Sequence, residues 1–299
     1  MDGIKHTVLQ HKPQFFLVIT MSKKKTPPSP ETLGLPLAGA DSHAHLGSPP
    51  LWNDREGVMA RARAAGVASI GQIFLRHRSY LEQKDWFSSI PGIAFILGLH
   101  PEDLPELEEN EFELIRSDIQ EDLDAGRKIK AVGEIGLDYF WKNTPHDMQT
   151  DYFAGLLGMA RDFKLPVVIH CRDAEEDCFA ILENNGFKKY PLLWHCFGGD
   201  QAMAERILAN GWHISVPGPL TYKANGHVRE ALKYIWETAP DRFMLETDCP
   251  YLAPEPWRGH TNEPALTAFT CAAAADFLGV DRAELWTRCG DTMRRFFAL

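Results

Sequence analysis

Eight short apolar runs, separated by helical patterns, constrain the fold of this chain more than any other feature of its sequence. They span residues 37–43, 67–74, 93–99, 129–137, 166–171, 192–196, 212–216 and 242–247. Several are apolar almost without alternation, as strands buried on both faces are. Strands that alternate with helices predict a parallel sheet built from βα units. Eight such strands predict closure into a (β/α)8 barrel, the TIM barrel of the α/β class.

The helical patterns between and after these runs agree with a single barrel domain. Residues 55–65 predict a helix that ends at Gly66, a typical C-terminal glycine. Residues 264–278 and 281–297 predict two closing helices. Because barrels of this kind span about 250 residues as one unit, we assign residues 39–299 to one domain.

Residues 1–38 have a different composition from the rest of the chain. A cluster of three lysines, residues 23–25, is followed by prolines at positions 27, 28 and 30. This composition favours a disordered or extended, solvated segment. Met21 begins a sequence typical of a translation start, so we treat it as a candidate alternative start.

Composition and charge exclude some classes of protein. The net charge of −10 argues against coating long nucleic acid through a basic face, but an acidic site filled with cations is compatible with a nuclease. Six cysteines without a CxxC pair predict reduced thiols and a cytoplasmic protein. No run approaches the roughly 18 apolar residues of a membrane span, so we expect neither membrane nor protein partners.

Histidines and carboxylates recur where the predicted strands end. The carboxyl ends of barrel strands meet at one mouth, where active sites of this fold lie. His43 and His45 are two residues apart and point to the same side of an extended chain, so both can reach one cation. Each group alone also fits a surface histidine or a salt-bridged carboxylate, but together they predict a metal site. The candidate ligands are His43, His45, Glu134, His170, His195 and Asp248.

Six ligands exceed the needs of one tetrahedral ion. Imidazoles and carboxylates suit magnesium, manganese or zinc, the last two more when nitrogen donors dominate. We therefore expect two divalent metal ions, about 3.5 to 4 Å apart, that polarise a scissile ester and supply the nucleophile.

Other polar and aromatic residues follow the same strand ends. Arg172 and Arg258 are candidates for binding a phosphodiester, with pairing to a loop carboxylate as the alternative for each. His100 is a candidate phosphate contact or proton donor, with a capping role as the alternative. Residues 139–141, Tyr-Phe-Trp, form either a stacking platform for bases or ordinary loop packing.

Six motifs in order resemble one known family. They are DSHAHL, VGEIGLDY, VVIHCRDA, HCFGG, LETDCPYLAP and RGHTNEP. Together they resemble the TatD-like metal-dependent hydrolases over residues 39–299. Two positions depart from the family pattern: Gly198 replaces a common serine, and Cys289-Gly290-Asp291 replaces a segment that often holds asparagine.

The resemblance implies an amidohydrolase-like barrel with two metal ions that removes nucleotides from DNA ends, single-stranded or frayed. Carried over by position, His43 and His45 bind the first ion, and Asp248 completes it and is a candidate proton acceptor. Glu134 bridges the ions, and His170 and His195 bind the second. We expect Glu134 and Asp248 to be catalytic.

Two other functions fit the same sequence. The same site can hydrolyse the ester of a D-aminoacyl-tRNA, or another ester or amide, and fold and metals do not separate these reactions. Internal pairing of both arginines, together with a mouth that lacks room for a strand, would favour such substrates. A non-catalytic binding barrel is the third possibility, and it predicts missing ligands.

Overall fold

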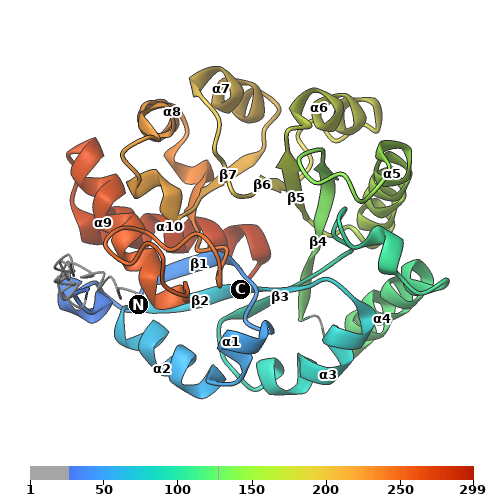
Figure 1. Ribbon diagram of the computed structural model, residues 1–299, viewed down its shortest axis with the longest axis horizontal. Helices are drawn as coiled ribbons and strands as arrows, with labels where there is room; N and C mark the ends of the chain where they lie inside the picture. Colours follow the sequence, from blue (N-terminus) through green and yellow to red (C-terminus); the bar gives the residue numbers. More distant parts are fainter. Residues whose placement is uncertain (1–26, 127) are drawn as a thin grey trace, which may run out of the picture.

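The strands of this protein form one parallel sheet that curves into a barrel (Figure 1). The computed structural model describes residues 27–126 and 128–299. Each strand pairs in parallel with the next along the chain. The strands are β1 (Gly39–Ala44), β2 (Val67–Phe74), β3 (Ile93–Leu97), β4 (Ile129–Asp138), β5 (Val167–Arg172), β6 (Leu192–Trp194), β7 (His213–Val216) and β8 (Phe243–Leu245). The predicted eight-stranded (β/α)8 barrel is confirmed.

The ring closes just beyond the end of β8. There, Ala44 and Cys249 form a parallel bridge. The backbone N–H of Asp248 donates to the carbonyl oxygen of His43 at 3.0 Å, and that of His45 donates to Cys249 at 2.9 Å. The hydrogen bonds that close the barrel are therefore made at its carboxyl end.

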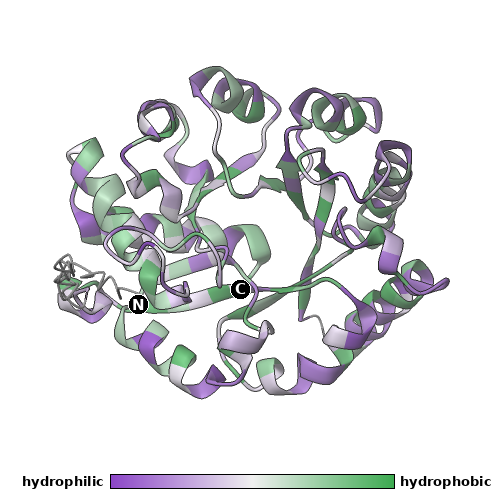
Figure 2. Cartoon of the chain, viewed as in Figure 1, coloured by the Kyte–Doolittle hydropathy of each residue, from purple (hydrophilic) through white to green (hydrophobic). Residues whose placement is uncertain are grey.

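Helices surround the sheet and carry both hydrophobic and hydrophilic residues (Figure 2). In α8, the buried residues are Val228, Ala231, Leu232 and Ile235, which is the spacing of one helix face. The helices are α1 (Pro49–Trp52), α2 (Arg55–Ala64), α3 (His77–Ser88), α4 (Glu111–Ala125), α5 (His146–Phe163), α6 (Glu175–Asn184), α7 (Gln201–Ala209), α8 (Gly226–Thr238), α9 (Thr267–Leu278) and α10 (Arg282–Phe297). Short 3-10 helices are η1 (Pro30–Leu33), η2 (Leu104–Glu106), η3 (Gly218–Thr221), η4 (Pro240–Arg242) and η5 (Pro264–Leu266).

The barrel interior is filled by side chains. Small and large apolar residues from the strands form a cluster that Met293 and Phe297 of α10 complete. The strand members of this cluster are Ala40, Ile73, Ala94, Ile96, Ala131, Val168, Leu193 and Met244. The barrel is a packed core rather than a pore, as is usual for this fold.

Part of the N-terminal segment packs against the barrel. The indole N–H of Trp257 donates to the carbonyl oxygen of Pro28 at 2.9 Å, and that of Trp286 donates to Pro36 at 2.9 Å. Residues 1–26, which include the lysine cluster and Met21, lie outside the described residues.

Two further expectations concern the state of the cysteines and the presence of a membrane-spanning helix. The six cysteines are free thiols. Within the described part of the chain, no helix combines the length and the apolar character needed to cross a membrane.

We predict that Asp41 is required for stable closure. Its buried carboxylate accepts the Thr247 backbone N–H at 2.8 Å and the Thr247 hydroxyl at 2.5 Å. Asp41→Ala should lower the free energy of unfolding by about 3 kcal/mol, because it leaves a buried N–H without an acceptor. Thr247→Val keeps that backbone bond and should cost about 1 kcal/mol. Urea unfolding of the metal-free proteins measures both, and equal losses would contradict the prediction.

Candidate metal centre

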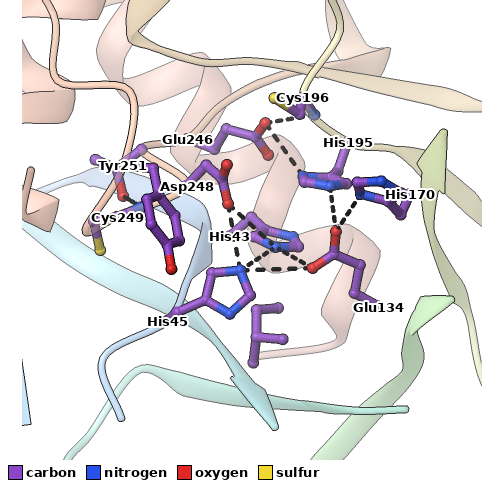
Figure 3. A network of polar contacts seen from close by, with 12 residues as sticks. His43, His45, Glu134, His170, His195, Cys196, Glu246, Asp248, Cys249 and Tyr251 are labelled. Atoms are coloured by element: carbon purple, nitrogen blue, oxygen red, sulfur yellow. Dashed lines mark hydrogen bonds and ion pairs between the residues drawn. The ribbon is translucent and has the colours of Figure 1, made fainter. Parts of the chain in front are cut away.

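Glu134 of β4 is buried at the centre of the site, and its two carboxylate oxygens face different histidines (Figure 3). Oε2 lies 3.1 Å from His43 Nε2 and 3.5 Å from His45 Nε2. Oε1 lies 2.7 Å from His195 Nε2 and 2.8 Å from His170 Nδ1. The carboxylate therefore joins two pairs of imidazoles.

Close packing of β4 against β5 brings Glu134 and His170 together. Gly136 pairs with His170 in register, and a Cβ at Gly136 would collide with the carbonyl oxygen of His170. Gly136 has a φ of +146°, a conformation that favours glycine. A glycine at this position is what allows the two strands to approach so closely.

Asp248 completes the cluster from the turn after β8. Its Oδ1 lies 3.3 Å from His45 Nε2 and 3.8 Å from His43 Nε2. Its backbone has a φ of +55°, so the chain leaves the extended conformation at this residue. The six side chains predicted from the strand ends thus lie together at the mouth of the barrel.

Two further carboxylates, not among the predicted ligands, lie behind histidines of the cluster. Asp138 Oδ2 lies 2.9 Å from His170 Nε2. Glu246 Oε1 lies 3.6 Å from His195 Nδ1. Carboxylates of this kind fix the orientation of metal-binding imidazoles.

Glu246 is itself held firmly. Its two oxygens accept the backbone N–H of Cys196 and the hydroxyl of Ser215, each at 2.5 Å. The sequence signal for Glu246 was its place in the LETD motif, two residues before Asp248.

The electrostatics of the cluster follow from these contacts. Burial favours a neutral Glu134, but the charges of His195 and His43 outweigh it and hold the pKa of Glu134 well below its usual value. Burial opposes a charged His170, but hydrogen bonds with Asp138 and Glu134 raise its pKa to about 9. For His195, the charges of Glu134 and Glu246 likewise overcome burial and raise the pKa. Positive charge is therefore favoured at His170 and His195, on the Oε1 side of Glu134, whereas burial lowers the pKa of His43 on the Oε2 side.

The donor set fits bound cations. Among the described residues, His43 Nδ1 and both ring nitrogens of His195 are buried without a hydrogen-bond partner of acceptable geometry. Three groups of residues each bring together three donor atoms that lie within 4.8 Å of one another. These groups are His43, His195 and Glu246; His43, His45 and Glu134; and His100, Glu134 and His170. Converging imidazoles and carboxylates can hold metal in place of the protons that they share.

A cavity of about 790 Å³ opens above the cluster. It is lined by five of the six predicted ligands, all except the fully buried His43, and by His100 and Arg172. Its size is that of a site for a small molecule or for one end of a polymer.

Comparison with known proteins finds relatives over nearly the whole barrel. The model of the family described as "TatD related DNase" matches residues 40–298. The chain is 31% identical over 259 residues to the uncharacterized metal-dependent hydrolase YabD of Bacillus subtilis, covering 87% of this chain and 98% of that protein.

The chain belongs to the TatD family. It is therefore a metal-dependent hydrolase. It is also 30% identical over 270 residues to a protein of Pantoea vagans named 3'-5' ssDNA/RNA exonuclease TatD, covering 87% of this chain and 99% of that protein. The crystal structure of YjjV, a TatD homologue from Escherichia coli, superposes with a TM-score of 0.80 at 24% identity, covering 88% of this chain and 99% of that one, which shows the shared fold.

His100 lies beside the centre of this TatD family member. Its Nε2 is 3.7 Å from Glu134 Oε1, and its Nδ1 accepts the backbone N–H of Glu102 at 3.2 Å. Burial and the nearby charge of His170 lower the pKa of His100 to about 3. It is therefore a neutral imidazole whose Nε2 carries the proton. His100 caps the loop and also lines the cavity.

The two predicted phosphate-binding arginines lie in different surroundings. The Arg172 guanidinium stacks 3.7 Å from the centre of the Phe140 ring, and that of Arg258 stacks 4.1 Å from the centre of the Tyr222 ring. Neither forms an ion pair with a carboxylate of the described residues. Arg172 lines the cavity, whereas Arg258 is not among its lining residues.

The residues of the Tyr-Phe-Trp run differ in their surroundings, so loop packing and a stacking platform for bases do not apply to all three alike. Tyr139 stacks on His146, with 3.6 Å between ring centroids, and its hydroxyl donates to Asp177 at 2.8 Å. Tyr139 is thus ordinary loop packing. Phe140 and Trp141 are exposed, and Trp141 lines the cavity.

We predict that metal stabilises the fold through Glu134. Mn²⁺ at about 100 times its dissociation constant should add about 2.7 kcal/mol of stability and raise the Tm of metal-free protein by about 5 °C. Glu134→Gln should lose most of this rise. As a matched control, Asp122→Asn alters a buried carboxylate that accepts the Ile129 N–H at 2.8 Å at the opposite end of β4. Calorimetry with and without Mn²⁺ checks the prediction, and an equal rise in Glu134→Gln would contradict it.

Proposed function

We propose that this TatD family member is a two-metal deoxyribonuclease that removes nucleotides from the ends of DNA strands. The proposal rests on the contacts of the Glu134 carboxylate. Its two oxygens face two separate histidine pairs beneath an open cavity. Binuclear sites that hydrolyse phosphodiesters use such a bridging arrangement.

The proposed ligand assignment follows the contacts of each oxygen. His43, His45 and Asp248 would hold one ion on the side of Glu134 Oε2. His170 and His195 would hold the other on the side of Oε1. Magnesium, manganese and zinc all suit these donors. When bound, two such ions polarise a phosphoryl oxygen and lower the pKa of a water molecule.

The protein's own side chains would orient the histidines, accept a proton and bind the phosphate. Asp138 and Glu246 orient His170 and His195 from behind. We propose that Asp248, at the edge of the cavity, accepts the proton of the attacking water. Arg172 binds a phosphate oxygen, because its guanidinium lines the cavity and is free of carboxylate partners in the described chain. His100, a neutral imidazole, donates a hydrogen bond from its Nε2 to a phosphate oxygen and does not transfer that proton.

A single-stranded or frayed end is the proposed substrate. The relative from Pantoea vagans bears the name of a 3'-5' exonuclease on single-stranded DNA and RNA, which supports this choice. We also propose a cytoplasmic location, on the basis of the free thiols.

Ester and amide hydrolysis, including that of D-aminoacyl-tRNA, stays the second candidate. It uses the same donors, but it requires no cationic group for phosphate, and the free guanidinium of Arg172 favours the phosphodiester. A non-catalytic barrel fits less well, because all six candidate ligands are present and lie together.

We predict that hydrolysis of DNA depends on the cluster. Metal-free protein given Mg²⁺, Mn²⁺ or Zn²⁺ should shorten end-labelled single-stranded DNA stepwise. Glu134→Ala and Asp248→Ala should lower kcat about a thousand-fold, since each removes a charge from the reacting centre. Asp122→Asn should retain activity. Gel analysis of the labelled products also gives the polarity.

Two outcomes would count against this proposal. Full activity of folded Glu134→Ala protein would contradict the role of the cluster. Intact DNA under every metal, with release of the amino acid from D-aminoacyl-tRNA, would establish the second candidate instead.

We predict that the two arginines differ in importance. Arg172→Ala should raise the KM for a short oligonucleotide about ten-fold to a hundred-fold, because a charge-assisted hydrogen bond to phosphate is lost. Arg258→Ala should change the KM less than about three-fold. Steady-state kinetics of both variants provide the measurement, and a larger effect at Arg258 would reverse the assignment.

A further inference from the structure

Two exposed aromatic side chains stand at the cavity mouth. Trp141 is 50% exposed and Tyr251 is 62% exposed, and both line the cavity. Exposed apolar side chains that gather at one place, here the rim of a cavity, mark ligand-binding grooves, whereas single scattered ones do not. Among the described residues, the other exposed aromatic side chains are Phe140, beside Trp141, and Phe277, on α9.

The two rings belong to opposite walls of the barrel. Trp141 follows β4 and Tyr251 follows the turn after β8, and strands four places apart in a ring of eight lie across from each other. Figure 3 shows Tyr251 on the side of Asp248 and His45, away from Glu134 and His170. The cavity is thus lined by an aromatic ring after β4 and by another after β8.

Each ring is tied to the cluster by a short turn. The Trp141 backbone N–H donates to Asp138 Oδ1 at 3.1 Å, while Oδ2 of the same carboxylate contacts His170. The Tyr251 backbone N–H donates to the carbonyl oxygen of Asp248 at 3.1 Å. Each turn thus fixes the backbone of an aromatic residue three positions beyond a carboxylate of the cluster.

A cationic group accompanies the ring on the β4 side. The Arg172 guanidinium lies 3.7 Å from the centre of the Phe140 ring and 5.8 Å from that of Trp141. Alternation of an aromatic face with a cation matches the alternation of base and phosphate along a single strand.

We infer that Trp141 and Tyr251 are base-stacking residues that flank the scissile phosphate. They select unpaired strands of any sequence, because every base has a stacking face and bases in a duplex are already stacked on each other. This inference rests on the proposed nuclease function and adds a specificity site to it.

Steady-state kinetics on oligothymidylate test the inference. Trp141→Ala and Tyr251→Ala should each raise the KM about ten-fold with kcat changed less than about three-fold, since stacking contributes to binding rather than to the chemical step. Trp141→Phe should restore most of the affinity. Phe277→Ala, an exposed aromatic away from the cavity, should behave like the wild type.

A second substrate separates stacking from a general effect on the loop. When the terminal nucleotides carry no base, the wild-type KM should rise by a similar factor. Trp141→Ala should then raise it no further, because the partner of the ring is already missing.

The outcomes distinguish the inference from the proposed function. If the wild type shortens oligothymidylate and the two alanine variants keep its KM, the stacking sites are wrong and the nuclease stands. If Trp141→Ala raised the KM for the base-free substrate ten-fold above the wild-type value for that substrate, stacking would also be overturned. If the wild type shortens no oligonucleotide with any metal, the nuclease proposal itself fails.

Discussion

The contact between one buried carboxylate and four imidazoles organises this protein. Glu134 lies inside the barrel mouth, where an unpaired charge is costly, so it requires positive charge from its neighbours. His45, His170 and His195, whose pKa values are raised, provide it as protonated rings, and all four imidazoles, His43 included, could provide it as ligands of bound cations. The close approach of β4 to β5, the carboxylates behind the histidines and the turn after β8 all place groups around this one side chain.

Much of the fold and of the centre could be predicted from the sequence because both depend on strand ends. Strands buried on both faces are readable as apolar runs, and their number fixes the closed barrel. Parallel strands direct their carboxyl ends to one rim, so a residue such as His195 needs only its position in a run to be placed near Glu134. The motifs of the TatD family then gave the same six residues independently.

The remaining features depend on side-chain direction, which a strand pattern does not contain. The period of two fails where the backbone leaves the extended region, as it does at Cys196 and Asp248, with φ of +51° and +55°. Glu246 and Asp248 are two residues apart, yet Glu246 lies 3.6 Å from His195 and Asp248 lies 3.3 Å from His45. Arg172 and Arg258 are alike in the sequence, because each is an arginine close to a strand end. Only the packing of the folded chain shows that Arg172 is the one that lines the cavity.

The filled interior of the barrel determines the route by which substrate enters the site and product leaves it. Met293 and Phe297 of α10 complete a solid apolar core below the cluster, so the cavity has its opening on the side of the strand ends. Whatever bond is hydrolysed, the released fragment leaves by the route through which the substrate entered. Departure of product and entry of the next substrate therefore compete for the same opening, so the rate of turnover depends on how quickly the product clears it.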